Sequence, residues 1–391
     1  MIKEKTVTIE PAKKSNIVIK EVKTKRDLRL FVDYPNKLYK GVKNFVPAFY
    51  GDDIADWDKN KNPAREYCDW KCFLAYRDGE IVGRIGAILS FKSNEKWKTN
   101  RMRFSQVDFI DDGEVSDALF AAVENWARES GCDEVHGPLG FCDMDREGML
   151  VEGYDKKSMF ITYYNHPYYN DHLERLGYQK DTDWMEYKIT APAVDSDAAI
   201  LMHRIAERSM NRNNYHIAKL KSRRDYKKYI PSIFNMINTC YAPLYGMVEL
   251  NDEQVKKYTN KFMPLINPEF VCFVLDEKDE VVAVGISAPS MADAIKKSNG
   301  RLFPFGFIGV LKALHKNDTI DMFIIAVRPD LQKTGVNAII LDHILRNCAA
   351  KGIKYAETGP MLETNVKVLS QWKMFEKEQH KRRRCYVKNI D

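Results

Sequence analysis

The feature that most constrains the fold of this chain is a diverged internal repeat. Ile19–Leu28 reads IKEVKTKRDL, and Ile217–Tyr226 reads IAKLKSRRDY. A repeat of this length signals a structural unit that is present twice, so the chain is predicted to contain a duplicated domain. Two further matches follow in the same order, Cys72-Phe73-Leu74 with Cys272-Phe273-Val274 and Gly137-Pro138 with Gly359-Pro360.

Each copy shows the same succession of patterns. A strand and a helix are followed by a hairpin, a strand, a helix and a strand ending in Gly-Pro, then by a helix and a last strand. Asp78-Gly79 between two apolar runs is typical of a tight hairpin turn. This order predicts an α/β fold in which a mixed sheet is covered by helices. The expected ranges are 17–22, 25–39, 71–77, 80–89, 102–110, 115–130 and 184–189 in the first copy, and 216–220, 223–241, 270–276, 280–287, 319–327, 336–350 and 354–357 in the second.

The length of 391 residues allows two domains with a core each. We expect a boundary between Thr190 and Tyr215, with domains at 17–190 and 205–391. Residues 1–16 are polar and lysine-rich without a secretory apolar segment, and predict a flexible tail. The eight cysteines include no metal-binding pattern, because Cys68 and Cys72 have no second pair. Cysteines in apolar stretches favour a reducing, cytoplasmic location and no metal.

The second copy contains a strand, a short polar loop and a helix between Ile324 and Leu345. A helix start presents unpaired backbone N–H groups and the positive end of a dipole, which together favour phosphate. Gly335 has no Cβ to obstruct an approaching ligand. The loop lacks the GxxxxGK[ST] pattern of a P-loop and holds one glycine, which is too few for a dinucleotide fingerprint. An ordinary strand-to-helix turn is the alternative interpretation.

This segment resembles the acyl-CoA loop of the GNAT acetyltransferase superfamily, written [QR]-x-x-G-x-[GA] after a strand that ends in V-x-P. Val327-Arg328-Pro329 matches the strand end, and Gln332 and Gly335 match the loop. Asn337 departs from the pattern, because the family has Gly or Ala there. The order of elements in both copies also resembles GNAT domains. The resemblance therefore implies two tandem GNAT-like acyl-CoA N-acyltransferase domains over nearly the whole chain.

The resemblance implies acyl-CoA, acetyl-CoA for example, as a co-substrate. In the family the fourth strand of the sheet splays from the fifth, and Glu357 ends the strand 354–357 beside that gap. Glu357 is therefore the candidate base, and Glu363 is a weaker candidate. A solvated carboxylate is the other interpretation of Glu357. Trp372 stands where the family often keeps a proton-donating tyrosine, and Tyr386 is the candidate replacement. The residues expected to hold the cofactor are Ala326, Val327, Arg328, Gln332, Lys333, Thr334, Gly335, Val336, Asn337, Ala338 and Asn365.

The first copy lacks such a loop. Asp111, Asp112 and Glu114 stand at its helix start, where they cap the helix and repel a pyrophosphate. We therefore expect the first copy to be a non-catalytic partner that shapes the acceptor site.

Two segments suggest other functions. Leu302–Leu314 is apolar but too short to span a bilayer. It is expected to pack on its own domain, with a substrate lid or a membrane-surface patch as alternatives. The basic run His380–Arg384 is expected to be a charged edge strand rather than a site for nucleic acid.

Three functions stay open. The first is acyl-CoA-dependent N-acylation of a small-molecule or peptide amine. The second is transfer of an amino acid from aminoacyl-tRNA, which also occurs on tandem GNAT-like folds. The third is binding of CoA or a partner without catalysis. The sequence leaves the acceptor, the acyl length and the oligomeric state open.

Overall fold

The structure is a computed structural model and describes residues 16–391. The predicted tail at 1–16 therefore lies outside the described residues, apart from Asn16.

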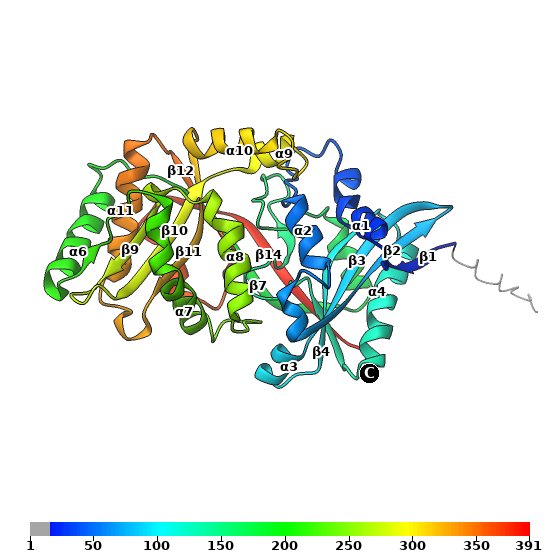
Figure 1. The fold of residues 1–391 in the computed structure, drawn as a ribbon. Helices are drawn as coiled ribbons and strands as arrows, with labels where there is room; N and C mark the ends of the chain where they lie inside the picture. The colour runs from blue at the N-terminus through cyan, green and yellow to red at the C-terminus, as the bar shows by residue number, and fades with distance from the viewer. Residues whose placement is uncertain (1–15) are drawn as a thin grey trace, which may run out of the picture.

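One mixed sheet runs through the molecule (Figure 1). Its strands follow the order β1-β2-β3-β4-β5-β14-β7-β12-β11-β10-β9-β8, with β6 paired to β14 and β13 paired to β7. The first copy contributes β1 (Val18–Glu21), β2 (Cys68–Arg77), β3 (Glu80–Ser90), β4 (Arg101–Phe109), β5 (Glu134–Gly137), β6 (Met149–Glu152) and β7 (Gln179–Thr190). The second contributes β8 (His216–Ile217), β9 (Val271–Leu275), β10 (Val281–Pro289), β11 (Thr319–Val327), β12 (Tyr355–Thr358), β13 (Met361–Leu362) and β14 (Lys377–Asn389).

The strand order reads as a palindrome around its centre. β1 to β5 on one side correspond to β8 to β12 on the other, which confirms the duplication inferred from the repeat. At the centre the two copies exchange their last strands. β7 of the first copy pairs with β12 of the second, while β14 of the second copy pairs with β5 of the first. β7 and β14 also pair with each other, so the two halves share one uninterrupted sheet.

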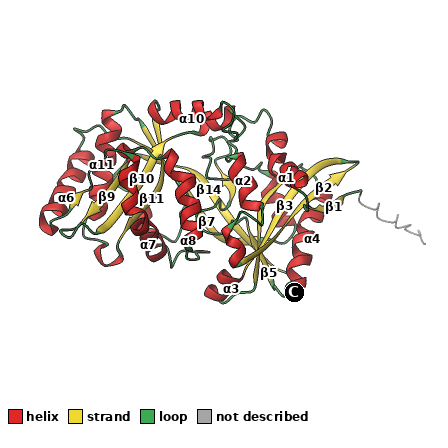
Figure 2. Ribbon diagram, viewed as in Figure 1, coloured by secondary structure: helices red, strands yellow, loops and turns green. Residues whose placement is uncertain are grey.

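Helices cover both faces of the sheet (Figure 2). In the first copy they are α1 (Lys25–Leu38), α2 (Tyr50–Trp57), α3 (Phe91–Trp97), α4 (Gly113–Glu129) and α5 (Tyr168–Arg175). In the second they are α6 (Asp197–Asn213), α7 (Ile230–Cys240), α8 (Asp252–Phe262), α9 (Ala292–Lys297), α10 (Gly306–His315), α11 (Val336–Ala350) and α12 (Val366–Ser370).

Strand alternation explains why the second copy needs helices on two faces. Along β9, Val271 and Phe273 lie in a core with residues of α7 and α8, whereas Cys272 and Val274 lie in a core with residues of α6 and α11. Every residue of β9 is buried, which is expected for a strand covered on both sides.

The expected elements agree closely with the structure, and three differences have physical causes. The helix expected at 223–241 is a 3-10 helix, Arg223–Tyr229, followed by α7, in which Pro231 occupies the first turn. Proline is tolerated there because that turn needs no N–H donor. The second difference is α6, which lies in the expected boundary region. The side chain of Ser196, just before α6, caps its first turn. α6 packs against α11.

The third difference is a correction. The prediction that His380–Arg384 forms a charged edge strand is wrong, because the strand exchange places β14 in the centre of the sheet. Lys381 and Arg383 are fully buried and are paired with the buried Glu186 of β7. Arg384 pairs with Asp183. The positive charges are therefore neutralised inside the protein and do not form a basic surface.

Candidate functional site

The sheet of the second copy opens between β11 and β12. The two strands pair in parallel only from Thr319 to Met322 on β11. The last contact of this seam is a hydrogen bond from the Gly359 N–H to the Met322 carbonyl, at 3.1 Å. β12 then ends at Thr358, while β11 continues to Val327 with β10 as its partner. One backbone edge of β11 is thus left without a neighbouring strand beyond Met322.

A cavity of about 260 Å³ lies in this opening. Its wall is mainly apolar and comes from α7, α8, β11, the turn after β12 and α12, with a contribution from the first copy. The residues include Ile230, Ile233, Phe234, Phe262, Met263, Leu265, Ile266, Met322, Phe323, Ile324, Ile325, Gly359, Pro360, Met361, Asn365, Val368 and Trp372.

Acidic side chains of the first copy contribute to the polar part of the cavity wall. They are Asp143, Asp145 and Glu147, in the loop that follows Gly137-Pro138. Asp145 is held in place, because its carboxylate accepts from the Tyr258 hydroxyl and from the Phe141 N–H, both at 2.9 Å. Asp143 and Glu147 also line the cavity, as a pair of partly buried acids.

Burial controls the protonation of this acid pair. It raises the pKa of Asp143 to about 6, although the nearby positive charges of Arg103 and Lys96 lower it. Burial and the charge of Asp143 raise the pKa of Glu147 well above its usual range. Two carboxyl groups in one enclosed site do not both ionise readily. Both acids therefore keep their protons to a higher pH than free carboxyl groups do.

The predicted cofactor loop lies at the end of the same strand, β11. Gly335 has φ of 87° and precedes α11, which begins without a side-chain cap. Lys333 also has a positive φ, and Lys333 and Thr334 are exposed. Gln332 is fixed between the Val327 carbonyl, at 3.4 Å, and the Lys367 ammonium, at 2.8 Å. No side chain caps the start of α11, and within its first turn the Ala338 N–H donates to the Gly335 carbonyl at 3.0 Å.

The helix α6, which sequence reasoning missed, lies against this loop. A Cβ at Gly335 would come within 3.2 Å of the Ile205 side chain on α6. The remaining predicted residues flank the loop. Val336 and Ala338 are buried in the core, Ala326 is buried at the end of β11, and the Arg328 guanidinium pairs with Asp330 at 2.8 Å.

The corresponding helix start in the first copy is occupied by its own side chains. The Asp112 carboxylate accepts from the N–H groups of Glu114 and Val115, at 3.0 and 3.3 Å. Arg77 pairs with Asp112 and with Glu114. The start of α4 thus carries a cap that α11 lacks.

The structure separates the predicted acid–base residues from the cavity. Glu357 lies in the paired part of β12, in register with Asp321, and its carboxylate is 3.4 Å from the Lys381 ammonium. Glu363 pairs with Lys180 at 2.7 Å. Neither contributes to the cavity wall.

Tyr386 is separated further by the strand exchange. It lies opposite Gly137 of the first copy, and its buried hydroxyl donates to Asn170 at 2.9 Å. Asn365 and Trp372, in contrast, line the cavity. Asn365 also caps α12, and the Trp372 indole N–H faces the Met361 sulfur at 3.2 Å.

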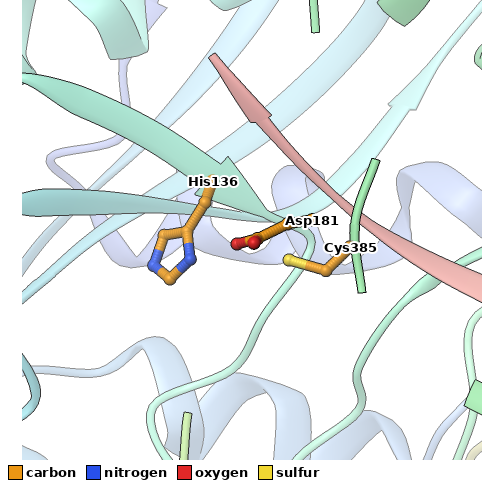
Figure 3. Close-up of side chains that lie close together, drawn as sticks. All are labelled: His136, Asp181 and Cys385. Carbon is orange, nitrogen blue, oxygen red and sulfur yellow. The ribbon is translucent and has the colours of Figure 1, made fainter. Parts of the chain in front are cut away.

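A cluster of His136, Asp181 and Cys385 has the composition of a metal site (Figure 3). Its potential ligand atoms lie within 4.8 Å of one another. The Tyr245 hydroxyl lies among them, 3.0 Å from His136 Nδ1, 2.5 Å from the Asp181 carboxylate and 3.5 Å from Cys385 Sγ. Arg101 also pairs with Asp181. The cluster is therefore a hydrogen-bonded junction that ties Tyr245 of the second copy to the first.

The acid pair, Asp143 and Glu147, could be predicted from the sequence only in part. Phe141 to Glu147 reads FCDMDRE, and this run of acids directly after Gly137-Pro138 was a usable signal. Its placement against the cavity of the other copy depends on the packing of the two copies.

No helix within residues 16–391 has both the length and the apolar character needed to cross a bilayer. No family model matches the chain. The chain is 26% identical over 378 residues to Protein YghO of Escherichia coli (strain K12), covering 94% of both proteins. It is 25% identical over 296 residues to a bacterial ceramide synthase of Caulobacter vibrioides (strain NA1000 / CB15N), covering 74% of both.

Among solved structures, the chain is similar to a tandem GNAT protein from the clavulanic acid biosynthesis pathway. The TM-score is 0.54 at 9% sequence identity, and the match covers 96% of this chain and 99% of that chain. The tandem GNAT fold expected from the repeat and the loop is thus confirmed.

Proposed function

We propose that the chain is an acyl-CoA-dependent N-acyltransferase whose acceptor is an amine carried on an apolar body. The observation that carries the proposal is the cavity between β11 and β12. It combines an apolar wall, a pair of acids and a strand edge without a neighbouring strand, and that strand leads to an uncapped helix start.

The acyl donor would lie along β11. The first N–H groups of α11 and the loop from Gln332 to Asn337 would hold its pyrophosphate, because a helix start favours anions. The backbone edge from Phe323 to Val327 would hold the pantetheine arm. A backbone N–H there would stabilise the negative charge that develops on the thioester oxygen.

The acid pair would handle the proton of the acceptor. An amine reaches the site as an ammonium ion, which the ionised carboxylate attracts and deprotonates. The free amine then attacks the thioester carbon, so that the C–N bond forms and the C–S bond breaks. The departing thiolate takes a proton, and Glu147, whose pKa is raised by burial and by Asp143, is a cavity acid that would supply it. Glu357 and Tyr386 remain predictions for these two roles.

The apolar wall determines the class of acceptor that we propose. Side chains such as Ile233, Phe234 and Phe262 offer no hydrogen bonds to a sugar or a peptide. The similarity to a bacterial ceramide synthase supports the same inference, because a ceramide is a long-chain amine joined to a fatty acyl group through an amide. We therefore favour a long-chain amine over a small polar one.

The test is a transfer assay with the purified chain. Acetyl-CoA and longer acyl-CoAs are offered with an alkyl amine or with a short polar amine, and the amide product and released CoA are measured. We expect an amide with the alkyl amine and loss of turnover in Asp143→Asn. Tight acyl-CoA binding with no amide from either amine would contradict the proposal and support the non-catalytic alternative.

A further inference from the structure

The segment between β10 and β11 presents an apolar surface to solvent. We name the side chains of Phe303, Phe305, Phe307, Ile308 and Leu311 the α10 surface. Phe303 and Phe305 are 80% and 75% exposed. This segment includes α10, and the opposite side of α10 is buried, because Val310 and Leu314 pack in a core. The helix is therefore apolar on both sides, although only one of them is covered within the chain.

The segment that carries this surface is tied to the first copy by hydrogen bonds, ion pairs and packing. The Gly300 carbonyl accepts from the Tyr50 N–H at 2.9 Å, and Arg301 pairs with Asp33 at 2.7 Å. On α9, Asp293 pairs with Lys157 of the first copy at 2.7 Å. The core beneath α10 contains Val46 and Phe49 of the first copy as well. α10 thus has a fixed position at the rim of the molecule, near the junction of the two copies (Figure 1).

Basic residues outnumber acidic ones along the segment that carries the α10 surface. Between residues 293 and 318 the basic residues are Lys296, Lys297, Arg301, Lys312 and Lys316, whereas the acidic ones are Asp293 and Asp318. Lys297, Lys312 and Lys316 are exposed. A group of phenylalanines flanked by lysines is complementary to the surface of an anionic bilayer, where apolar side chains enter the acyl boundary and lysines remain at the headgroups.

The α10 surface also adjoins the cavity. Phe262, Leu265 and Phe323 line the cavity and belong to the core on which α10 packs. A bilayer at α10 would therefore lie next to the wall of the apolar site.

We propose that the α10 surface docks the protein on the surface of a bilayer that contains anionic lipid. The inference goes beyond the proposed transfer reaction, because vesicle binding requires no turnover. The occupant is a lipid surface. A second copy of this chain is an alternative occupant that the test must exclude.

The experiment is co-sedimentation of the full chain with vesicles of phosphatidylcholine, alone or mixed with an equal part of phosphatidylglycerol. The parent chain should bind the mixed vesicles. The triple variant Phe303→Ser, Phe305→Ser and Leu311→Gln should bind at least about tenfold more weakly. The double variant Lys312→Glu and Lys316→Glu should weaken binding to the mixed vesicles by about fivefold per lysine. Its binding to pure phosphatidylcholine vesicles should not change.

A matched control removes exposed apolar side chains elsewhere. Val18 and Phe91 are 54% and 56% exposed and belong to the first copy. The double variant Val18→Ser and Phe91→Ser should bind vesicles like the parent, and a thermal melt verifies that each variant folds. Turnover of the alkyl amine in solution without vesicles separates the two proposals, because the α10 variants should retain it. Equal vesicle binding by parent and triple variant, or a parent dimer that the triple variant abolishes in light scattering, would overturn the proposal.

Discussion

Lys381 on β14 and Glu186 on β7 form an ion pair of 3.1 Å in which neither side chain is exposed. Arg383 pairs with the other oxygen of Glu186, and Lys381 also reaches Glu357 of β12. The pairs connect three neighbouring strands at the point where the two copies exchange their last strands. The charges of Arg383 and Lys381 overcome the effect of burial and hold the pKa of Glu186 at about 2. Two carboxylates, of Glu186 and Glu357, thus balance the two buried cations at the centre of the sheet.

We expect Glu186→Gln to lower the free energy of unfolding by about 3–5 kcal/mol, because breaking a buried ion pair leaves a charge without compensation. Urea unfolding at pH 7 measures the change. Glu378→Gln is the control, since Glu378 lies on the neighbouring strand β14 but its side chain is 57% exposed in its pair with Lys156. That control should cost less than about 1 kcal/mol. Equal losses would show that the buried cluster is not a special contributor to stability.

A second prediction concerns Asp321, which faces Glu357 across the seam between β11 and β12. Burial, and then the charge of Glu357, raise the pKa of Asp321 to about 7. The folded state therefore holds more protons than the unfolded state between about pH 4 and pH 7. Stability from this group falls as pH rises through that window, because the unfolded state ionises first.

Asp321→Asn should remove this part of the pH dependence. At pH 8 the variant is expected to be more stable than the parent by on the order of 1 kcal/mol, and at pH 4 the difference should vanish. Chemical unfolding at a series of pH values measures it. Asp318→Asn, at an exposed position nearby, should leave the pH profile unchanged. A parent whose stability does not decrease relative to Asp321→Asn between pH 4 and 8 would contradict the raised pKa.

The sequence allowed most of the second copy to be predicted, because local patterns determine those elements. β11 and α11 have the expected limits, since an apolar run and a helical period are both encoded locally. The exchange of β7 and β14 was not predictable in this way. The local pattern of each strand fits either half of the sheet, so the strand's partners are selected by long-range pairing. For the same reason Tyr386, the candidate proton donor of the second copy, lies opposite Gly137 of the first.

The candidate site was predictable to a similar extent. The loop at Gly335 is a local motif, and its backbone geometry is visible in the choice of glycine. Asp143 and Glu147 belong to the first copy but line the cavity of the second. Their raised pKa values result from burial, which requires the packed structure.

The loop after β11 provides a third prediction. Gly335→Asp should abolish acyl-CoA binding in calorimetry, because the side chain would meet Ile205 and its charge would repel the pyrophosphate. Since Gly335 has a positive φ, strain contributes to this effect. Thr334→Glu, at an exposed neighbour, isolates the effect of charge and should weaken binding by about tenfold. Gly113→Asp, at the start of α4, should leave binding unchanged. Equal loss in Gly335→Asp and Gly113→Asp would place the donor elsewhere.

The last prediction concerns the pH dependence of turnover. A base must be ionised to accept a proton, and the pKa of Asp143 is raised to about 6 by burial. The transfer rate should therefore rise as pH increases through about 6 and level off above it. Asp143→Asn keeps the shape of the side chain and removes the base, so turnover should fall by about 100-fold or more and lose this rise, while acyl-CoA affinity stays the same. Glu357→Gln is the comparison, because Glu357 lies outside the cavity wall beside Lys381. A greater loss in Glu357→Gln than in Asp143→Asn would move the base to the seam between β11 and β12.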